Sequence, residues 1–234
     1  MDFNDNPKEA EFRTKVRKFL DENAQRRGEV IKTPTTAGAP ESVSGEKAAN
    51  DALMKAKEWQ KKKAEAGLAA IIWPKEFGGY GGSPIEQVIY QQEEHNYFVH
   101  SGYFEIGIGM LGPTMMVWGK DEDKKKYLPK MLTGEEIWCQ LFSEPAAGSD
   151  LAGIKMKAEK DGSDWILNGQ KVWTSGAHLS DYGMIVARSD PNAVKHKGLT
   201  YFFLDMKTPG IEVKPIKQIS GTAHFNEVFF NDVR

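Results

Sequence analysis

Residues 137–153 read IWCQLFSEPAAGSDLAG and separate two parts of the chain whose apolar residues follow different patterns. Before this stretch the apolar residues recur at helical spacing, and after it they alternate as they do in β-strands. The stretch starts as an extended run and breaks at Pro145, which fixes its own φ and has no backbone donor. The small residues that follow leave the backbone bare, and Gly148 is free to take a positive φ. Such a turn is suited to binding an anion through its N–H groups, although an ordinary turn after a strand has the same pattern.

A second stretch, residues 165–181, reads WILNGQKVWTSGAHLSD and adds an aromatic ring and two hydroxyls. Its Asn168-Gly169 pair, with apolar residues on both sides, predicts a β-hairpin with a two-residue turn. Trp173 then stands directly before Thr174 and Ser175. A flat aromatic beside two hydroxyls suits an isoalloxazine ring, which has a broad apolar face and a polar edge. Taken alone, Trp173 is better explained as a residue of the hydrophobic core.

These two stretches, in this order, resemble the acyl-CoA dehydrogenase family. Residues 143–150 match the family's Thr/Ser-Glu-Pro-Gly/Ala-Ala-Gly-Ser-Asp turn, and residues 168–175 match its Asn-Gly-x-Lys-x-Trp-Ile/Thr-Thr/Ser pattern. Residues 225–234 match a third family marker, the strand Phe-Asn-Glu-Val-Phe-Phe-Asn/Asp-Asp-Val-Arg. The resemblance spans the whole chain, and its three ordered motifs make it specific. Two positions depart from the family pattern: Gln140, where an aromatic or apolar residue is common, and Ala146, where Gly is usual.

The resemblance implies an α+β multidomain fold, in which an N-terminal all-α domain at residues 1–134 precedes a middle β-barrel domain at residues 135–234. The C-terminal four-helix domain of the family would be absent from this chain. Gly134 marks the expected boundary, because the periodicity changes there from helical to alternating. We expect turns at Asp161-Gly162, Asn168-Gly169 and Pro209-Gly210. They would separate short strands at residues 154–158, 165–167, 182–187, 199–205, 211–215 and 227–230.

The resemblance also implies a bound FAD that contacts both stretches. The hydroxyls of Ser143 and Ser175 would face the flavin ring, and Ser149 would lie where the pyrophosphate and the acyl-CoA meet. Ser149 is therefore the expected substrate-binding residue as well. The expected cofactor-binding residues are Gln140, Leu141, Phe142, Ser143, Gly148, Ser149, Trp173, Thr174 and Ser175. We expect no metal site, because the histidines lack ligand spacing with cysteine or carboxylates.

The implied reaction is α,β-dehydrogenation of an acyl-CoA thioester, in which a carboxylate takes the α-proton while the β-hydrogen leaves as hydride to flavin N5. In this family the base is a glutamate of the C-terminal domain. We therefore assign no catalytic residue within residues 1–234, and we expect the isolated chain to bind flavin weakly. The resemblance further implies a role in lipid degradation by β-oxidation, a homo-oligomer (dimer or tetramer) and an electron-transfer flavoprotein as acceptor. An acyl-CoA oxidase that uses oxygen and a non-catalytic acyl-CoA-binding subunit are the alternatives.

The composition is that of a globular chain of 234 residues, of which 40% are hydrophobic. A net charge of −2 gives no field that would attract nucleic acid. The single cysteine, Cys139, excludes an internal disulfide, and its apolar neighbours predict a buried, inert thiol. The N-terminal residues lack the pattern of a signal peptide, and no run approaches the length of a membrane span. We therefore expect a bacterial cytoplasm or an organelle matrix, and no membrane insertion.

The N-terminal half contains two clear helix starts, since Asn6-Pro7 is followed by Glu9 and Ser83-Pro84 by Glu86. Residues 77–82, FGGYGG, are glycine-rich but lack the Lys-Ser/Thr ending of a phosphate loop, so we expect a tight connection between helices. Residues 27–47 have the composition of a polar loop. The apolar residues 97–118 contain glycines that indicate either room for an acyl chain or close helix packing, namely Gly102, Gly107, Gly109 and Gly112.

Overall fold

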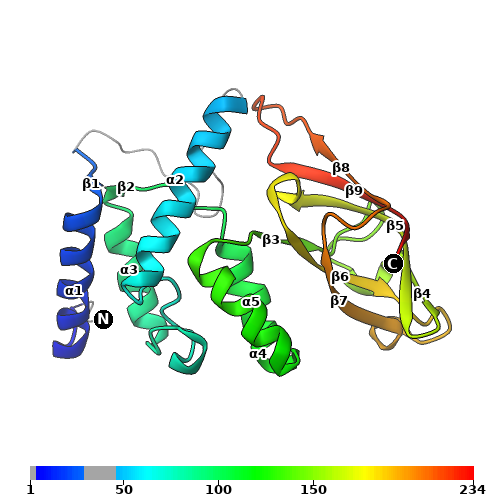
Figure 1. The fold of residues 1–234 in the computed structure, drawn as a ribbon, viewed down its shortest axis with the longest axis horizontal. Helices are drawn as coiled ribbons and strands as arrows, with labels where there is room; N and C mark the ends of the chain where they lie inside the picture. The colour runs from blue at the N-terminus through cyan, green and yellow to red at the C-terminus, as the bar shows by residue number, and fades with distance from the viewer. Residues whose placement is uncertain (1–3, 29–45) are drawn as a thin grey trace. The chain divides into compact units, whose positions relative to one another are not determined.

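The computed structural model describes residues 4–28 and 46–234, and it contains two compact units (Figure 1). The helical unit comprises Met1–Ile108 and Gly112–Glu135, and the β unit comprises Gly109–Leu111 and Glu136–Arg234. Most of the polar loop predicted at residues 27–47 lies outside the described residues. This architecture, a helical N-terminal region followed by a curled β-sheet, confirms the predicted fold class.

The helical unit is built from helices that lie close together in Figure 1 and from one small strand pair. The strands β1 (Gln25–Arg26) and β2 (Tyr97–Phe98) pair antiparallel. A 3-10 turn at Lys75–Phe77 and a π-helical turn at Gly107–Leu111 precede α3 and α4, respectively. The helices are α1 (Pro7–Asn23), α2 (Glu46–Glu65), α3 (Pro84–Glu94), α4 (Gly112–Trp118) and α5 (Asp121–Thr133).

The two predicted helix starts are confirmed as complete capping boxes. At α1 the Glu9 N–H donates to Asn6 Oδ1 at 3.0 Å, and the Asn6 N–H donates to Glu9 Oε2 at 2.9 Å. At α3 the same exchange joins Ser83 and Glu86, at 3.2 and 2.7 Å. Each cap satisfies two backbone donors that the first helical turn leaves unpaired, which stabilises the helix by about 1 kcal/mol. The apolar faces of these helices share one core, formed by Phe12, Val16, Leu20, Trp59, Leu68, Ile71, Ile89, Tyr90 and Tyr97.

The glycine-rich residues 77–82 form a tight connection, as predicted. Each backbone N–H of residues 78–82 donates to a carbonyl of residues 70–75, for example Gly81 to Trp73 at 2.9 Å. A Cβ built on Gly79 would stand only 2.2 Å from the Trp73 carbonyl oxygen, so no side chain fits there. The glycines of this segment thus serve backbone packing.

The glycines around α4 differ from one another in what surrounds them. A Cβ on Gly112 would meet the Trp73 ring at 2.1 Å, while the Trp73 indole N–H donates to the Ile108 carbonyl at 2.8 Å. Close packing therefore explains Gly112. A Cβ on Gly109 would meet nothing within 4 Å, so this position is open and the acyl-chain hypothesis stays a prediction there.

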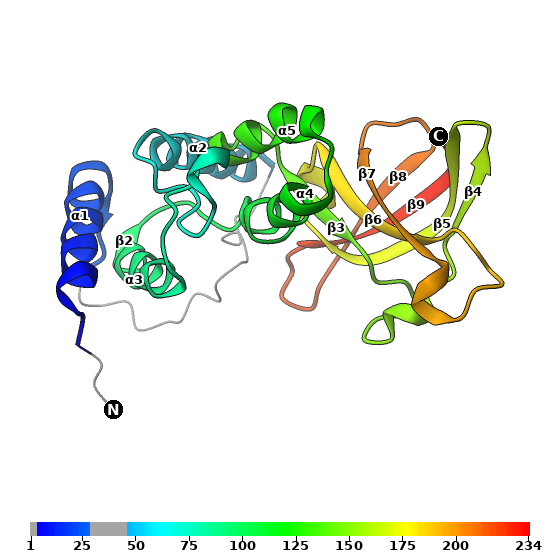
Figure 2. The same cartoon turned by 90° about the horizontal axis from the view of Figure 1, so that it is seen from below.

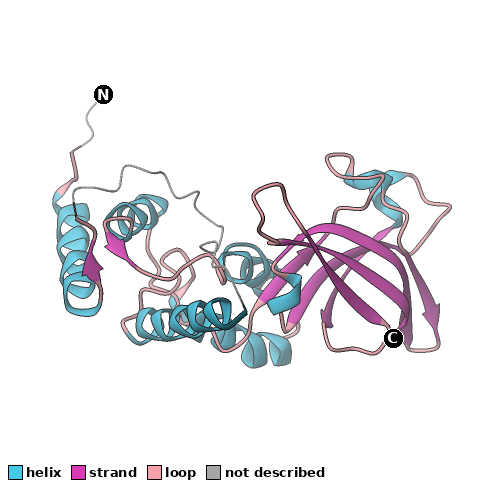
Figure 3. Cartoon of the chain, turned by 90° about the horizontal axis from the view of Figure 1, so that it is seen from above, coloured by secondary structure: helices cyan, strands magenta, loops and turns pink. Residues whose placement is uncertain are grey.

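The β unit is a seven-stranded sheet with the order β3-β6-β4-β5-β9-β8, in which β7 also pairs with β6. Figures 2 and 3 show that this sheet curls around its own interior. The strand β6 pairs parallel with β3 and β4, and the other pairs are antiparallel. The strands are β3 (Trp138–Leu141), β4 (Lys157–Asp161), β5 (Asp164–Ser175), β6 (Tyr182–Arg188), β7 (Leu199–Asp205), β8 (Ile211–Ile216) and β9 (Phe225–Val233).

The prediction of a hairpin turn at Asn168-Gly169 is wrong. The β5 strand runs without a turn from Asp164 to Ser175, and the pair lies at a register shift where β5 faces β9. Gly169 has a φ of 145°, and the Asn168 side chain donates to Asp232 Oδ1 at 3.0 Å. The turn between β4 and β5 lies earlier, at Gly162, where the sequence also predicted one. An Asn-Gly pair suits a bulge as well as a turn, and its pairing with a distant strand decides between them.

The strand predicted at residues 154–158 also begins later than expected. The structure starts β4 at Lys157 and places Ile154 at the end of a 3-10 turn, Leu151–Gly153. The Ile154 N–H donates to the Leu151 carbonyl at 3.3 Å, so this apolar residue belongs to the turn while its side chain is fully buried. The apolar side chain of Ile154 suggested a strand, but it reflects burial in the turn.

Candidate functional site

The two sequence stretches meet directly in the β unit. The backbone N–H of Val172 in β5 donates to the Ser143 carbonyl at 2.9 Å, where the chain leaves β3. Ser143 therefore lies beside the segment that carries Trp173 and Ser175. The structure brings together the hydroxyl-bearing turn and the indole that the sequence placed 30 residues apart.

Trp173 is exposed because β5 bulges at this point. The register of β5 with β9 shifts between Lys171, which faces Val228, and Thr174, which faces Asn226. Within the bulge Trp173 has a φ of 59°, and its side chain is 59% exposed. A left-handed conformation costs a residue other than glycine about 1–2 kcal/mol, and such strain is often found at functional sites.

The hydroxyls next to Trp173 have different environments. Ser175 is exposed, whereas Thr174 is buried and its Oγ1 has no hydrogen-bond partner in the described part of the chain. The Thr174 carbonyl accepts a hydrogen bond from Asn226 Nδ2 at 2.9 Å. The Thr174 side chain therefore does not share the exposed surface of Trp173 and Ser175.

The turn after β3 is closed at its start by backbone hydrogen bonds, and the residues that follow are exposed. Glu144 and Ala147 exchange two backbone hydrogen bonds, at 2.7 and 3.0 Å. Beyond them Gly148 and Ser149 are exposed, and their N–H groups take no part in the backbone hydrogen bonds of the described residues. Gly148 does not adopt the positive φ that its residue type permits, and a Cβ built there would meet nothing within 4 Å.

The remaining predicted residues lie at the start of this turn. Gln140 is half-buried in β3 opposite Met184 of β6, and Phe142 is half-buried with its ring edge-on to Tyr201 at 6.4 Å. Leu141 is fully buried in the core of the β unit. The Leu141 side chain is therefore committed to packing, which leaves only its backbone for any ligand.

The sequence reasoning missed a buried ion pair, Lys171 and Glu144, that links β5 to the turn. The Lys171 side chain is fully buried, and its ammonium group lies 2.8 Å from Glu144 Oε1. Burial lowers the pKa of Lys171, while its hydrogen bond to Glu144 acts in the opposite direction. Lys171 is the lysine of the Asn-Gly-x-Lys pattern, so the motif itself carried the signal.

A second polar group that the sequence reasoning missed borders the bulge. The Nδ1 atom of His178 lies 3.1 Å from Asn226 Oδ1, and Asn226 is fully buried. His178 is exposed as a whole, and its ring is partly desolvated where it faces Asn226. This desolvation lowers the pKa of His178, the hydrogen bond with Asn226 raises it, and the neighbouring His224 lowers it. Asn226 thus links His178 to the backbone at Thr174, next to Trp173.

Cys139 has the inert environment that the sequence predicted. It is fully buried in β3, and burial raises its pKa to about 12. The thiolate, which is the reactive form, is therefore scarce at neutral pH.

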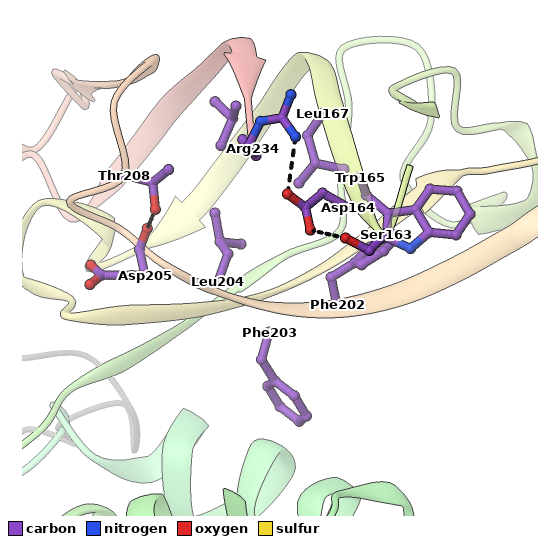
Figure 4. Close-up of a pocket in the computed structure, with 11 residues that line it drawn as sticks. Ser163, Asp164, Trp165, Leu167, Phe202, Phe203, Leu204, Asp205, Thr208 and Arg234 are labelled. Atoms are coloured by element: carbon purple, nitrogen blue, oxygen red, sulfur yellow. Dashed lines mark hydrogen bonds and ion pairs between the residues drawn. The ribbon is translucent and has the colours of Figure 1, made fainter. Parts of the chain in front are cut away.

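Figure 4 shows a cavity of about 510 Å³ in the β unit. At its rim Arg234 pairs with Asp164 at 3.0 Å, and Figure 4 shows Phe203 pointing away from the other labelled side chains. None of the predicted cofactor-binding residues lines it. Its lining consists of Ser163, Asp164, Trp165, Leu167, Phe202, Phe203, Leu204, Asp205, Thr208, Val233 and Arg234.

Within residues 4–28 and 46–234, no three His, Cys, Asp or Glu side chains gather in a way that could hold a metal ion. Over the same described residues, none of the helices combines the length and the apolar character that crossing a membrane requires.

Comparison with known proteins identifies the family. The model of the acyl-CoA dehydrogenase N-terminal domain matches residues 6–135, and the model of its middle domain matches residues 139–233. The chain belongs to the acyl-CoA dehydrogenase family. Acyl-CoA dehydrogenase IpdE1 of Mycobacterium tuberculosis is 39% identical over 224 residues, which are 96% of this chain and 56% of that protein.

Solved structures of acyl-CoA dehydrogenases share the fold. One titled "Tcur3481-Tcur3483 steroid ACAD" has a TM-score of 0.78 and 29% identity, and the match covers 100% of this chain and 56% of that one. The ChsE4-ChsE5 complex from Mycobacterium tuberculosis has a TM-score of 0.76 and 28% identity, covering 100% and 55%. The chain thus spans about half the length of these relatives.

The exposed residues of the β unit are compatible with a flavin nucleotide. The exposed indole of Trp173 supplies a flat apolar surface, with the exposed Ser175 beside it. The N–H groups of Gly148 and Ser149, which make no backbone hydrogen bond within residues 4–28 and 46–234, suit the oxygens of a pyrophosphate. The hydrogen bond from Val172 to the Ser143 carbonyl connects the segment that carries Trp173 to the start of the turn.

Proposed function

We propose that the protein containing this chain is an FAD-dependent acyl-CoA dehydrogenase that removes hydrogen from the α and β carbons of an acyl-CoA thioester. The observation that carries the proposal is the hydrogen bond from Val172 to Ser143, which puts the exposed Trp173 bulge beside the open turn. In this proposal residues 1–134 are the N-terminal domain and residues 135–234 the middle domain. Membership of the family supports both parts.

The cofactor would be held at two places of the β unit. Ser143 and Ser175 would meet the polar edge of the flavin ring, with Trp173 against its apolar face. Gly148 and Ser149 would hold the pyrophosphate, and Ser149 would also face the acyl-CoA. The flavin, when bound, supplies the acceptor for the hydride that leaves the β carbon.

The part of this chain in the reaction is to bind and orient. A strained bulge and a turn closed by Glu144 and Ala147 form surfaces whose geometry is set before a ligand arrives, which lowers the cost of ordering on binding. No residue of this chain is assigned as the proton acceptor. We propose that a glutamate outside residues 1–234 takes the α-proton.

The proposed partners follow from the family and from the relatives' names. One similar structure is a complex of two named proteins, ChsE4 and ChsE5, so assembly with further subunits, either copies of this chain or a related chain, is part of the proposal. We propose an electron-transfer flavoprotein as acceptor, a role in lipid degradation by β-oxidation, and a location in a bacterial cytoplasm or an organelle matrix.

The test is a visible spectrum of the purified full-length protein. We expect flavin bands that bleach when a suitable acyl-CoA is added without oxygen, and recover with an electron-transfer flavoprotein or a dye. Stoichiometric peroxide during aerobic turnover would show an oxidase instead. A colourless protein that binds acyl-CoA and no FAD would show the non-catalytic alternative and overturn the proposal.

A further inference from the structure

The ammonium group of Lys171 joins three separate segments of the β unit. It donates to the Phe142 carbonyl at 3.0 Å, to Glu144 Oε1 at 2.8 Å and to the Val186 carbonyl of β6 at 2.8 Å. An ammonium group has three protons to donate, so these acceptors use its full capacity. The side chain from β5 therefore fixes the start of the open turn against two strands.

Glu144 links the turn to the residues that follow it, just before β4. Its carboxylate accepts hydrogen bonds from the N–H of Lys155 at 2.6 Å and from the N–H of Met156 at 3.1 Å. Arg188 binds the same segment, donating to the carbonyls of Ala152 at 2.6 Å and Ile154 at 3.0 Å. The exposed residues between these anchors are thus bounded on both sides by charge-assisted hydrogen bonds.

Consecutive residues of β5 hold consecutive residues of the turn. Lys171 donates from its side chain to the Phe142 carbonyl, and Val172 donates from its backbone to the Ser143 carbonyl. The bulge that exposes Trp173 starts directly after Lys171. Any shift of the Lys171 side chain would therefore move the turn relative to the indole.

Stability alone is a weak reason to place an ion pair here. The charged atoms lie in a region whose other buried residues are mostly apolar, and removing two charges from water carries a desolvation penalty that can exceed their mutual attraction. Apolar residues of similar volume commonly serve a core equally well. The hydrogen bonds to Phe142 and Val186 offer a different reason, namely the position of the turn.

We propose that Lys171, together with Glu144, is a positioning residue that sets the open turn at residues 143–149 against the Trp173 bulge, so that both surfaces fit one flavin nucleotide. This inference rests on the proposed function. Lys171 touches neither the cofactor nor the substrate in this account, because its side chain is fully buried under the turn.

The experiment compares three variants of the full-length protein. Lys171→Met removes the donor and leaves the buried Glu144 carboxylate without a cation, so this variant is expected to be unstable. Lys171→Met/Glu144→Gln removes both charges, and the Gln side chain still accepts from Lys155 and Met156. Leu167→Ala is the matched control, because Leu167 is buried in the same strand and its truncation destabilises while it removes none of the side-chain hydrogen bonds that hold the turn.

We expect the double variant to melt near the wild-type temperature and to bind FAD about tenfold more weakly or worse, since small displacements of a positioned group are costly. Its kcat should fall more than its KM rises, and its flavin bands should shift. Leu167→Ala should lower the melting temperature and leave FAD affinity within about twofold. A double variant that binds FAD like the wild type would overturn the inference. An equal loss of FAD affinity in Leu167→Ala would overturn it as well.

Hydrogen exchange separates this inference from the proposed function. If the wild-type protein binds no FAD, the proposed function fails, and the exchange rates of the 143–149 amides still report the position of the turn. Faster exchange there in the double variant, and not in Leu167→Ala, would support the role of Lys171. Unchanged exchange in the double variant would contradict it.

Discussion

Two turns of this chain are rich in small residues, and they use their backbone donors in opposite ways. In the helical unit, the N–H groups of residues 78–82 all donate to nearby carbonyls, and Gly79 leaves no room for a Cβ. In the β unit, Gly148 and Ser149 are exposed, their N–H groups are unused by the described backbone, and Gly148 has open space around it. The comparison teaches that glycine content alone does not predict a ligand site, and that the backbone donors of the 148–149 segment are the ones left for the proposed cofactor.

The largest expected effect comes from adding one methyl group to each turn. Gly79→Ala should lower the free energy of unfolding by about 1–3 kcal/mol, because the new Cβ would overlap the Trp73 carbonyl. Gly148→Ala should change it by less than ~0.5 kcal/mol. Urea unfolding of both variants measures the difference. Similar losses in the two variants would break the comparison.

The strained bulge gives the next largest effect. Trp173→Gly and Trp173→Ala both remove the indole, so both should weaken FAD binding. Trp173 has a φ of 59°, which glycine adopts more easily than alanine. The free energy of unfolding of the Gly variant should therefore be about 1 kcal/mol higher than that of the Ala variant. Isothermal FAD titration and thermal melts of the pair measure these outcomes. An Ala variant at least as stable as the Gly variant would mean that the left-handed backbone is not strained.

The smallest expected effect is a pH dependence confined to one of the two regions. The folded-state pKa of His178 is lowered by partial burial, so the unfolded state takes up its proton first as the pH falls. Its contribution to stability is therefore complete above the ordinary histidine pKa of about 6.5 and is lost as the pH drops below it. As the pH drops below about 6.5, the free energy of unfolding of the wild type should fall relative to that of His178→Gln. A difference between the two proteins that stays constant with pH would contradict the lowered pKa.

The glycine-rich turn should be insensitive over the same pH range. Glu86 beside it has a pKa lowered first of all by the backbone hydrogen bond at Ser83, and burial raises the pKa of Tyr80. Neither group titrates between about pH 5 and 8, so hydrogen exchange at residues 78–82 should follow only the intrinsic pH dependence of exchange.

Local signals predicted the helical unit well. The capping boxes at Asn6 and Ser83 depend on residues within three positions, and the missing Lys-Ser/Thr ending was enough to interpret residues 77–82 as a connection. The alternating pattern likewise predicted a β unit after Gly134. The domain boundary at that residue stays a prediction.

Features of the β unit that depend on distant pairing escaped the sequence. Asn168-Gly169 became a bulge because β9, some 60 residues later, pairs on both sides of it. Lys171 entered the sequence analysis as one position of the family pattern, and the approach of Phe142 and Val186, which gives its buried ammonium group partners, depends on the fold. Thr174 was grouped with Ser175, although consecutive residues of a strand point to opposite faces of the sheet, which leaves Thr174 buried and Ser175 exposed.

Hydrogen exchange of the full-length protein with and without FAD tests the central claim most directly. The account predicts that FAD slows exchange of the amides within residues 143–149 and leaves residues 78–82 unchanged. The reason is that the N–H groups of residues 78–82 already donate to carbonyls, whereas those of Gly148 and Ser149 make no bond in the described backbone. Slower exchange at residues 78–82, or no change at residues 143–149 when FAD is bound, would contradict it.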